Sequence, residues 1–244
     1  MRERYKAGRH QLPLAEISRV DIKQKLKQWN KDKWESKNRL MYENYEENRW
    51  PWFNDSLDPD IEEFIVAAGS EPLDILDLGT CSGSQGIELA KRGHRVVGTD
   101  ISETALEQAE IALGREDGVA MELLIDDITD SALAENQFDL VLDRGCYHSI
   151  CVFQHHEYVA GIQRVLRPGG ILLLKTMSSD EKRFVTYDKL GNKAIQMPYH
   201  FTRERLEEVL SPHFEVQDIR DSFFYSKIVE PPAQARFSIL RNSG

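Results

Sequence analysis

The hydrophobic positions of the chain follow two different patterns before and after residue 73. Residues 14–50 are mostly polar, and their apolar positions recur at loose helical spacing, which predicts helix. From residue 73 onward, short apolar runs alternate with amphipathic stretches. Strands that alternate with helices in this way predict a parallel, doubly wound, Rossmann-like α/β sheet covered on both faces.

The expected elements of the second region are short and regularly ordered. Strands are expected at residues 73–78, 95–99, 120–125, 138–142 and 171–175, and helices near 86–92, 103–113, 155–166 and 202–210. The end of the chain differs, because two strand-like runs at 214–220 and 236–240 have no helix between them. We therefore expect an antiparallel final pair on an otherwise parallel sheet.

The first region predicts an N-terminal helical extension. An aromatic cluster at 50–53 follows it, and Asp58-Pro59-Asp60 should start a helix that runs through Ala68 and stops at Gly69. These signals divide the chain into an arm or lid at 1–57 and a main domain at 58–244. The aromatic side chains of the arm, including Tyr42, Tyr45, Trp50 and Trp52, either form a lid over a ligand or pack on the core.

Composition places the chain among globular proteins. It has 244 residues, of which 41% are hydrophobic and 30% are charged, so a sizeable core is possible. No apolar run is long enough to span a bilayer, and no secretory signal follows the N-terminus, so we expect a cytoplasmic protein that does not bind membranes. The three cysteines lack metal-type spacing, which favours reduced thiols.

Charge is unevenly distributed along the chain. The net charge is −10, whereas residues 1–50 contain 13 Lys and Arg against 8 Asp and Glu. A negative protein without a basic stripe is unlike a nucleic-acid binder. The basic arm either touches an acidic partner or pairs with its own acidic domain, and the second interpretation is favoured.

The loop after the first strand carries the strongest chemical signal. Its sequence, Asp77-Leu78-Gly79-Thr80-Cys81-Ser82-Gly83, has glycines that permit a tight turn before a helix. Such a turn fits both NAD and S-adenosylmethionine (SAM). Asp77 would repel the pyrophosphate of NAD but suits the ammonium and sulfonium of SAM. The NAD-type register would also need glycine where the chain has Cys81.

Carboxylates also stand at the ends of the next two strands. Asp100 closes the second strand and is placed to accept hydrogen bonds from ribose hydroxyls, although it could instead cap the next helix, a role that suits Ser102 better. Asp126 and Asp127 end the third strand, where a carboxylate and a backbone N–H can meet an adenine. Asp127 is preferred, with a turn residue as the alternative.

Taken in order, these motifs resemble the class I SAM-dependent methyltransferases. The resemblance covers residues 73–176 and rests on the Asp-Leu-Gly-Thr-Cys-Ser-Gly loop, Asp100, the Asp pair at 126–127, the Phe-Asp-Leu-Val run at 138–141 and Arg-Pro-Gly-Gly at 167–170. It implies a seven-stranded, mostly parallel sheet with an antiparallel C-terminal strand. The cofactor contacts that we expect are Asp77, Gly79, Thr80, Gly83, Asp100, Ile101, Asp127, Ile128 and Asp143. Cys81 departs from the family loop, where glycine is usual.

The segment Asp143-Arg144-Gly145-Cys146-Tyr147-His148 follows the fourth strand, where open α/β sheets bind ligands. Its Asp-Arg-Gly, with Trp-Pro-Trp upstream, is similar to the thiopurine S-methyltransferase-like and tellurite-resistance methyltransferases, which act on small molecules. His148 is the leading candidate for a general base, followed by Tyr147 and His200, and a purely structural histidine is the equal alternative. Cys146 is interpreted as a buried spacer.

Arg144 could hold a substrate carboxylate or pair with Asp139 or Glu157. The expected substrate-binding residues are Trp50, Trp52, Arg144, Tyr199 and His200. His155 and His156 lack partners at metal spacing, so no metal is expected.

The sequence thus predicts methyl transfer from SAM to a small molecule by in-line displacement. Methylation of a protein or RNA, or a non-catalytic SAM-binding partner protein, are the alternatives, and an NAD oxidoreductase is more remote. The acceptor atom, which is S, Se, N, O or C, and the oligomeric state stay open.

Overall fold

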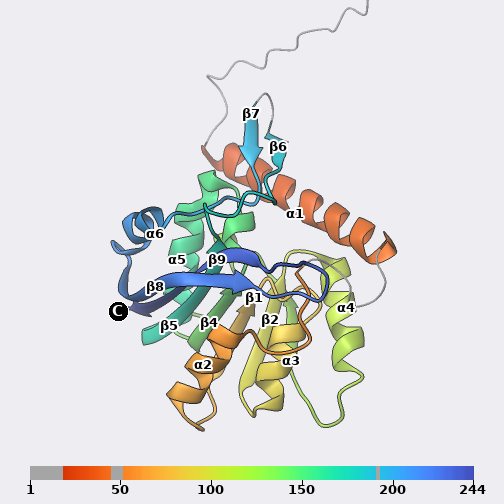
Figure 1. The fold of residues 1–244 in the computed structure, drawn as a ribbon, viewed down its shortest axis with the longest axis vertical. Helices are drawn as coiled ribbons and strands as arrows, with labels where there is room; N and C mark the ends of the chain where they lie inside the picture. Colours follow the sequence, from red (N-terminus) through yellow and green to blue (C-terminus); the bar gives the residue numbers. More distant parts are fainter. Residues whose placement is uncertain (1–18, 45–51, 191–192) are drawn as a thin grey trace, which may run out of the picture.

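The computed structural model describes residues 19–44, 52–190 and 193–244 of the chain. A sheet with the strand order β3-β2-β1-β4-β5-β9-β8 forms its centre (Figure 1). The seven strands are β1 (Asp74–Leu78), β2 (Arg95–Asp100), β3 (Glu122–Ile125), β4 (Phe138–Arg144), β5 (Leu166–Met177), β8 (Phe214–Phe224) and β9 (Ala233–Asn242). Strands β1 to β5 are parallel, and β9 is antiparallel to both β5 and β8. The predicted Rossmann-like sheet with an antiparallel C-terminal strand is confirmed.

Six α-helices accompany the sheet in the described part of the chain. They are α1 (Arg19–Asn44), α2 (Pro59–Ala68), α3 (Ser84–Lys91), α4 (Glu103–Leu113), α5 (His155–Val165) and α6 (Arg203–Leu210). The side chains of Asp58, Ser102 and Thr202 cap α2, α4 and α6 by accepting a hydrogen bond from a backbone N–H of the first turn. These caps explain why the expected starts of all three helices agree with the structure within one residue.

Adjacent residues of the central strands point to opposite faces of the sheet and fill two separate cores. Leu172 and Leu174 of β5 pack with residues of α5 and α6. Leu173 lies between them and packs with Ile61 and Ile65 of α2 on the other face. Because both faces are covered, these strands appear in the sequence as continuous apolar runs.

The structure differs from the expectation in two places. Strand β5 begins at Leu166 rather than near residue 171, because Phe138 pairs with Leu166 across a register shift ahead of the main ladder. A separate antiparallel pair, β6 (Tyr187–Leu190) and β7 (Lys193–Gln196), stands apart from the central sheet at the top of Figure 1. No element was predicted there, because the polar and charged residues of 187–196 show no clear hydrophobic alternation.

Helix α1 lies across the top of the domain in Figure 1 and forms ion pairs with it. Lys27 Nζ is 3.0 Å from Asp130 Oδ2, and Lys31 Nζ is 3.3 Å from Glu103 Oε1. The hydrogen bond from the Lys27 ammonium to Asp130 raises the pKa of Lys27. The described part of the basic arm therefore pairs with its own acidic domain, which agrees with the favoured interpretation of the charge pattern.

Candidate active site

Three carboxylates meet where β1, β2 and β4 end, because neighbouring parallel strands bring their carboxyl ends to the same edge. Asp77, Asp100 and Asp143 occupy these ends. Within the described residues none of the three forms an ion pair with a lysine or arginine. Burial is the largest influence on each of them and raises each pKa to about 6.

The Asp77 carboxylate organises the loop that follows β1. Its Oδ2 accepts hydrogen bonds from the Thr80 hydroxyl (2.5 Å) and from the backbone N–H of Gly86 (3.0 Å) at the start of α3. Thr80 also donates its backbone N–H to the Thr99 carbonyl of β2 at 2.9 Å. One side chain thus ties strand, loop and helix together.

The loop itself needs positive φ angles at several positions. Gly79 has φ +65°, and a Cβ built there would lie 3.1 Å from Cys146 Cβ, so a side chain at this position would be both strained and crowded. Gly83 has φ +78° and precedes the first turn of α3. Cys81 adopts φ +54° although it carries a side chain. The loop therefore keeps a left-handed conformation at the position where the family usually has glycine.

Two aromatic side chains of the N-terminal region reach Cys81. The hydroxyl of Tyr42 in α1 lies 3.1 Å from Cys81 Sγ, and the indole N–H of Trp52 donates to the same sulfur at 3.2 Å. Trp52 is 39% exposed, so it is not an ordinary core residue. Trp50 and Tyr45, which were expected beside it, lie outside the described residues.

The Asp100 carboxylate is held by one backbone donor on each oxygen. Oδ2 accepts from the N–H of Cys81 (3.1 Å), and Oδ1 accepts from the N–H of Ser102 (3.0 Å). Ser102, not Asp100, caps α4 by accepting from the N–H of Ala105. Each carboxylate oxygen therefore keeps a lone pair for another donor. Ile101 is half-buried beside it.

The aspartates after β3 differ in their partners. Asp127 Oδ1 accepts from the backbone N–H (3.0 Å) and the hydroxyl (2.7 Å) of Thr129, which makes it the cap of a short 3-10 helix starting at Ile128. Asp126 Oδ1 accepts from the N–H of Ala132 at 2.9 Å. Asp126 Oδ2 is buried and has no partner within the described part of the chain.

The Asp143 carboxylate is used completely by its own chain. It accepts from the backbone N–H groups of Gly145 (2.9 Å), Cys146 (2.6 Å) and Tyr147 (2.8 Å) and from the hydroxyl of Tyr158 (2.6 Å). Four donors fill the roughly four lone-pair positions that a carboxylate offers. Asp143 therefore shapes the turn after β4.

Tyr147, a predicted catalytic residue, lies entirely within the core. Its ring is fully buried and packs on Tyr158, His155 and Phe201 at centroid distances of 4.5, 4.3 and 5.2 Å. Burial raises its pKa, and its hydroxyl has no hydrogen-bond partner among the described residues. The geometry gives its side chain a packing role.

His148, the other predicted catalytic residue, is buried next to β5 and β8. Its Nδ1 accepts a hydrogen bond from the backbone N–H of Met177 at 2.9 Å. Its ring meets the ring of Phe224 edge-on at 5.5 Å. Burial, followed by electrostatic repulsion from His200 and Arg144, lowers its pKa to about 3, so the imidazole is neutral.

Arg144 pairs with neither Asp139 nor Glu157. Its guanidinium is almost buried and donates to Asp58 Oδ2 (2.9 Å), to the carbonyl of Trp52 (2.9 Å) and to the carbonyl of Tyr225 (2.8 Å). All five donors belong to one planar group, so Arg144 fixes these three segments relative to each other. This engagement opposes its predicted role as an anchor for a substrate carboxylate.

The buried charge cluster that continues from Arg144 was not predicted from the sequence. Lys175 of β5 is fully buried and bonds to Asp58 and, at 2.6 Å, to Asp60. Gln85 of α3 is tied to the same segment, because its Oε1 accepts from the N–H of Asp58 at 2.8 Å. A lysine that ends the apolar run of residues 171–174 was the one available signal.

Tyr199 and His200 lie on the segment before α6. The N–H of Tyr199 donates to the carbonyl of His148 at 2.7 Å, and the Nε2 of His200 lies 3.0 Å from the carbonyl of Phe184. Both side chains are half-buried. The structure thus brings this segment against the turn after β4, as expected.

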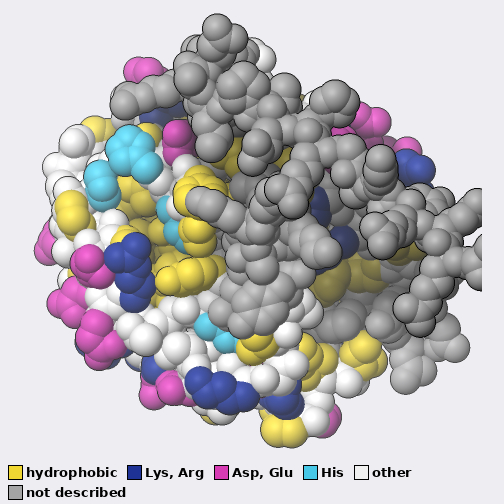
Figure 2. All heavy atoms as spheres, turned by 90° about the horizontal axis from the view of Figure 1, so that it is seen from above, with side chains coloured by type: hydrophobic (Ala, Val, Ile, Leu, Met, Phe, Trp, Pro, Cys, Tyr) yellow, Lys and Arg dark blue, Asp and Glu magenta, His cyan; other side chains and the backbone are white. Residues whose placement is uncertain are grey.

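The described surface seen from above is not strongly basic. Figure 2 gives this view and shows hydrophobic side chains and histidines beside the residues that are not described, with Lys and Arg scattered. Across the described ranges, no group of three His, Cys, Asp or Glu side chains could hold a metal ion. All three cysteine thiols are free. No helix in the described part is long and apolar enough to cross a membrane.

Comparison with known sequences points to one activity. A family model described as a methyltransferase domain matches residues 75–170. The 2-heptyl-1-hydroxyquinolin-4(1H)-one methyltransferase of Mycobacteroides abscessus is 25% identical over 179 residues, which are 73% of this chain and 74% of that protein. The protein-lysine N-methyltransferase efm4 of Schizosaccharomyces pombe is 29% identical over 178 residues, which cover 64% of this chain and 73% of the relative.

Comparison with solved structures shows the same fold. The 1,6-didemethyltoxoflavin-N1-methyltransferase of Burkholderia thailandensis, whose structure contains 1,6-didemethyltoxoflavin and S-adenosylhomocysteine, superimposes with a TM-score of 0.63 at 18% identity. The match covers 94% of this chain and 93% of that one. The matched domain, the methyltransferase relatives and the shared fold agree, and the chain is a class I SAM-dependent methyltransferase.

Proposed function

We propose that the enzyme methylates a small molecule at the carboxyl edge of the sheet, beneath a lid formed by α1 and residues 52–58. The observation that carries this proposal is the contact of Tyr42 and Trp52 with Cys81, the central residue of the cofactor loop. A loop that is covered in this way favours an acceptor small enough to enter beneath the cover.

The fastening of the lid supports the proposal. Arg144 donates hydrogen bonds to the Trp52 carbonyl and to the Asp58 carboxylate. The Gln85 side chain accepts from the backbone N–H of Asp58 and donates to the backbone carbonyl of Ser56. At the other side of the loop, Glu35 of α1 accepts a hydrogen bond from the Ser102 hydroxyl at 2.7 Å. The cover is therefore anchored on both sides of the loop.

The same edge fits the chemistry of SAM. We assign the ribose hydroxyls to Asp100, whose two oxygens each keep a lone pair, and the adenine to Asp127 and the backbone of Ile128. The turn from Asp77 through Thr80 to Gly83, with its exposed Gly79, would receive the methionyl part of SAM. The carboxylates of Asp77 and Asp100 form no ion pair in the described chain, so they favour a cation there. Ile101 flanks the ribose. Asp143 is reassigned from cofactor contact to support of the turn after β4.

Charge argues for a small molecule over RNA. The net charge is −10, and Lys27 and Lys31 of α1 are paired with acidic residues of the domain rather than aligned along an open face. A relative and a structural neighbour named above act on heterocyclic small molecules by their names, which supports the same choice.

A methyl-transfer screen with labelled SAM tests the proposal. The panel contains thiols, selenols, phenols, amines and carboxylates, alongside total tRNA and a mixture of unmodified proteins. We expect label in at least one small-molecule class and background incorporation into both macromolecular fractions. Label confined to tRNA or to protein would contradict the proposal and point to the corresponding alternative. Calorimetric titration with SAM is the control that shows that the purified enzyme binds its cofactor.

A further inference from the structure

The ring of His148 has only one tautomer that satisfies its surroundings. The backbone N–H of Met177 can only donate, so Nδ1 must present its lone pair at 2.9 Å. A neutral imidazole carries a single N–H, which must then be on Nε2. Within the described residues, Nε2 has no hydrogen-bond partner.

The elements around the ring also keep it neutral. Arg144 faces it from β4 and His200 from the segment before α6, while Phe224 of β8 and Met177 of β5 contribute no charge. A second proton would have to sit on Nδ1, directly against the N–H of Met177. Protonation would therefore break the one hydrogen bond that orients the ring.

We propose that His148 donates its Nε2–H to the methyl acceptor and is not a general base, so that the acceptor reaches the site already ionised. This inference rests on the proposed small-molecule function. It reverses the direction of the hydrogen bond that the sequence predicted for this histidine. The acceptor class becomes thiols, selenols and acidic hydroxyl groups that lose their proton in water near neutral pH.

The turn after β4 offers no other base. The Asp143 carboxylate already accepts four hydrogen bonds. The Tyr147 side chain is fully buried in the core. Burial raises the pKa of the Cys146 thiol, so it stays protonated. None of these three side chains, nor His148, can remove a proton from an acceptor at this turn, and the Nε2 of neighbouring His200 is directed at the Phe184 carbonyl at 3.0 Å.

The transfer step balances without a proton. The acceptor anion forms a bond to the methyl carbon, the bond from that carbon to the sulfonium breaks, and the sulfur keeps the electron pair. The products are a neutral methylated acceptor and S-adenosylhomocysteine. The His148 N–H orients the acceptor anion through a charge-assisted hydrogen bond and excludes water from it.

Nitrogen NMR of the ring provides a test that does not depend on turnover. In enzyme labelled with ¹⁵N-histidine, we expect His148 to show an unprotonated Nδ1 and a protonated Nε2 from about pH 5 to about pH 8. The variant H148N identifies its signals. A titration of His148 between about pH 6 and 7, or the opposite tautomer, overturns the inference.

Two substitutions separate the functions of the two ring nitrogens. H148N places an oxygen where Nδ1 accepts from Met177 but removes the N–H of Nε2 that is proposed to donate to the acceptor. H148Q places an amide N–H near the position of Nε2. For an ionised aryl thiol, we expect kcat/KM to fall about 10-fold or more in H148N and to be substantially restored in H148Q. Equal loss in both variants, with thermal unfolding showing that both fold, overturns the donor role.

The acceptors themselves complete the test. With aryl thiols and nitrophenols of graded acidity, the rising limb of the pH profile of kcat/KM should follow the pKa of each acceptor. A rising limb that stays at one pH for all acceptors reveals a base on the enzyme and overturns the inference, while leaving the small-molecule function intact. SAM binding without turnover of any ionised acceptor also overturns it, and transfer only to macromolecules contradicts the proposed function instead.

Discussion

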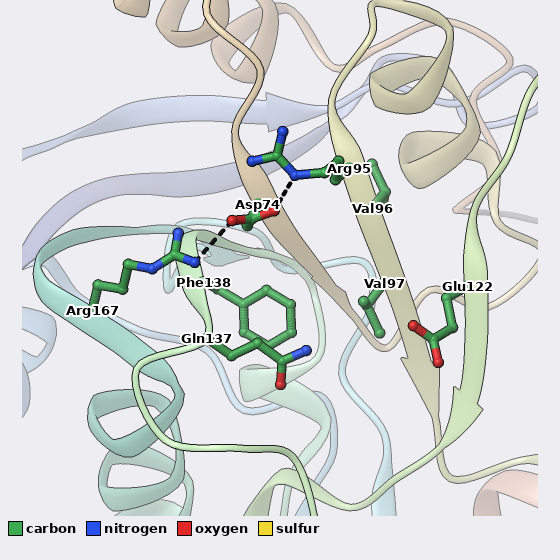
Figure 3. Close-up of a pocket in the computed structure, with 8 residues that line it drawn as sticks. All are labelled: Asp74, Arg95, Val96, Val97, Glu122, Gln137, Phe138 and Arg167. Carbon is green, nitrogen blue, oxygen red and sulfur yellow. Dashed lines mark hydrogen bonds and ion pairs between the residues drawn. The ribbon is translucent and has the colours of Figure 1, made fainter.

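The two edges of the sheet both carry aspartates, but they satisfy them in opposite ways. At the amino edge, Asp74 bonds to Arg95 and, at 2.8 Å, to Arg167, and Arg167 also reaches Asp139. Figure 3 shows the contacts of Asp74 with Arg95 and Arg167, and these three residues line a cavity whose volume is about 320 Å³. The hydrogen bond from Arg95 is the main reason that the pKa of Asp74 is lowered.

At the carboxyl edge the aspartates receive hydrogen bonds but no cation. Asp77, Asp100 and Asp143 are held by N–H and O–H donors, and their pKa values are raised to about 6. At the amino edge the aspartates are neutralised by arginines, whereas at the carboxyl edge no lysine or arginine of the described chain neutralises them. A cavity alone is therefore a poor guide to the site, because the unneutralised charge marks the edge where a cationic ligand fits.

Replacing one aspartate at each edge gives the largest expected contrast. We expect Asp100→Asn to weaken SAM binding about 100-fold, because it removes a charge and directs an N–H toward donors that already occupy the site. Asp139→Asn, the control, removes a part-exposed ion pair at the amino edge and should change the affinity by less than about twofold. Isothermal titration calorimetry measures both, and similar losses in the two variants would remove the distinction between the edges.

The pH dependence of SAM binding should be smaller but diagnostic. Ionised Asp77 and Asp100 attract the cation, and they become protonated as the pH falls through about 6. We therefore expect the affinity to decrease several-fold, up to about 10-fold, between about pH 7.5 and about pH 5. Affinity that is constant over this range would show that neither carboxylate titrates there.

The same raised pKa values have a consequence for the free protein. A carboxyl that binds its proton more tightly in the folded chain than in the unfolded one destabilises the fold as the pH rises from its pKa in the unfolded chain to its pKa in the folded chain. Asp74, with its lowered pKa, acts in the opposite direction, and its contribution is lost only as the solution becomes more acidic than its usual pKa. Saturating SAM should raise the melting temperature more at about pH 7.5 than at about pH 5.

The smallest expected effect concerns Tyr147, which lies in the turn after β4 at the carboxyl edge. Tyr147→Phe removes a hydroxyl that is buried without a described partner, so stability should stay equal or rise by up to about 1 kcal/mol. We expect kcat/KM to change by less than about twofold, since the ring keeps its packing. Thermal unfolding and steady-state kinetics measure this, and a loss above about tenfold would return Tyr147 to the catalytic residues.

Local rules predicted most of the fold. The helix from Glu103 to Leu113 and the final antiparallel pair follow from capping residues, apolar periodicity and the absence of an intervening helix. The strands at 187–190 and 193–196 were not predicted, because the sequence there shows no regular apolar alternation. The narrower resemblance to thiopurine S-methyltransferase-like enzymes stays a prediction.

The sequence by itself determined the class of enzyme and the edge of the sheet where its ligands belong. Glycines at 79 and 83 and strand-end aspartates at 77 and 100 are local features, since each depends on its own turn or strand end. Only the tertiary structure decided what the polar side chains do there. Arg144 meets Asp58 from 86 positions away, and His148 meets the N–H of Met177 from 29 positions away. The direction of a hydrogen bond depends on such distant partners, so no local pattern distinguishes a base from a donor.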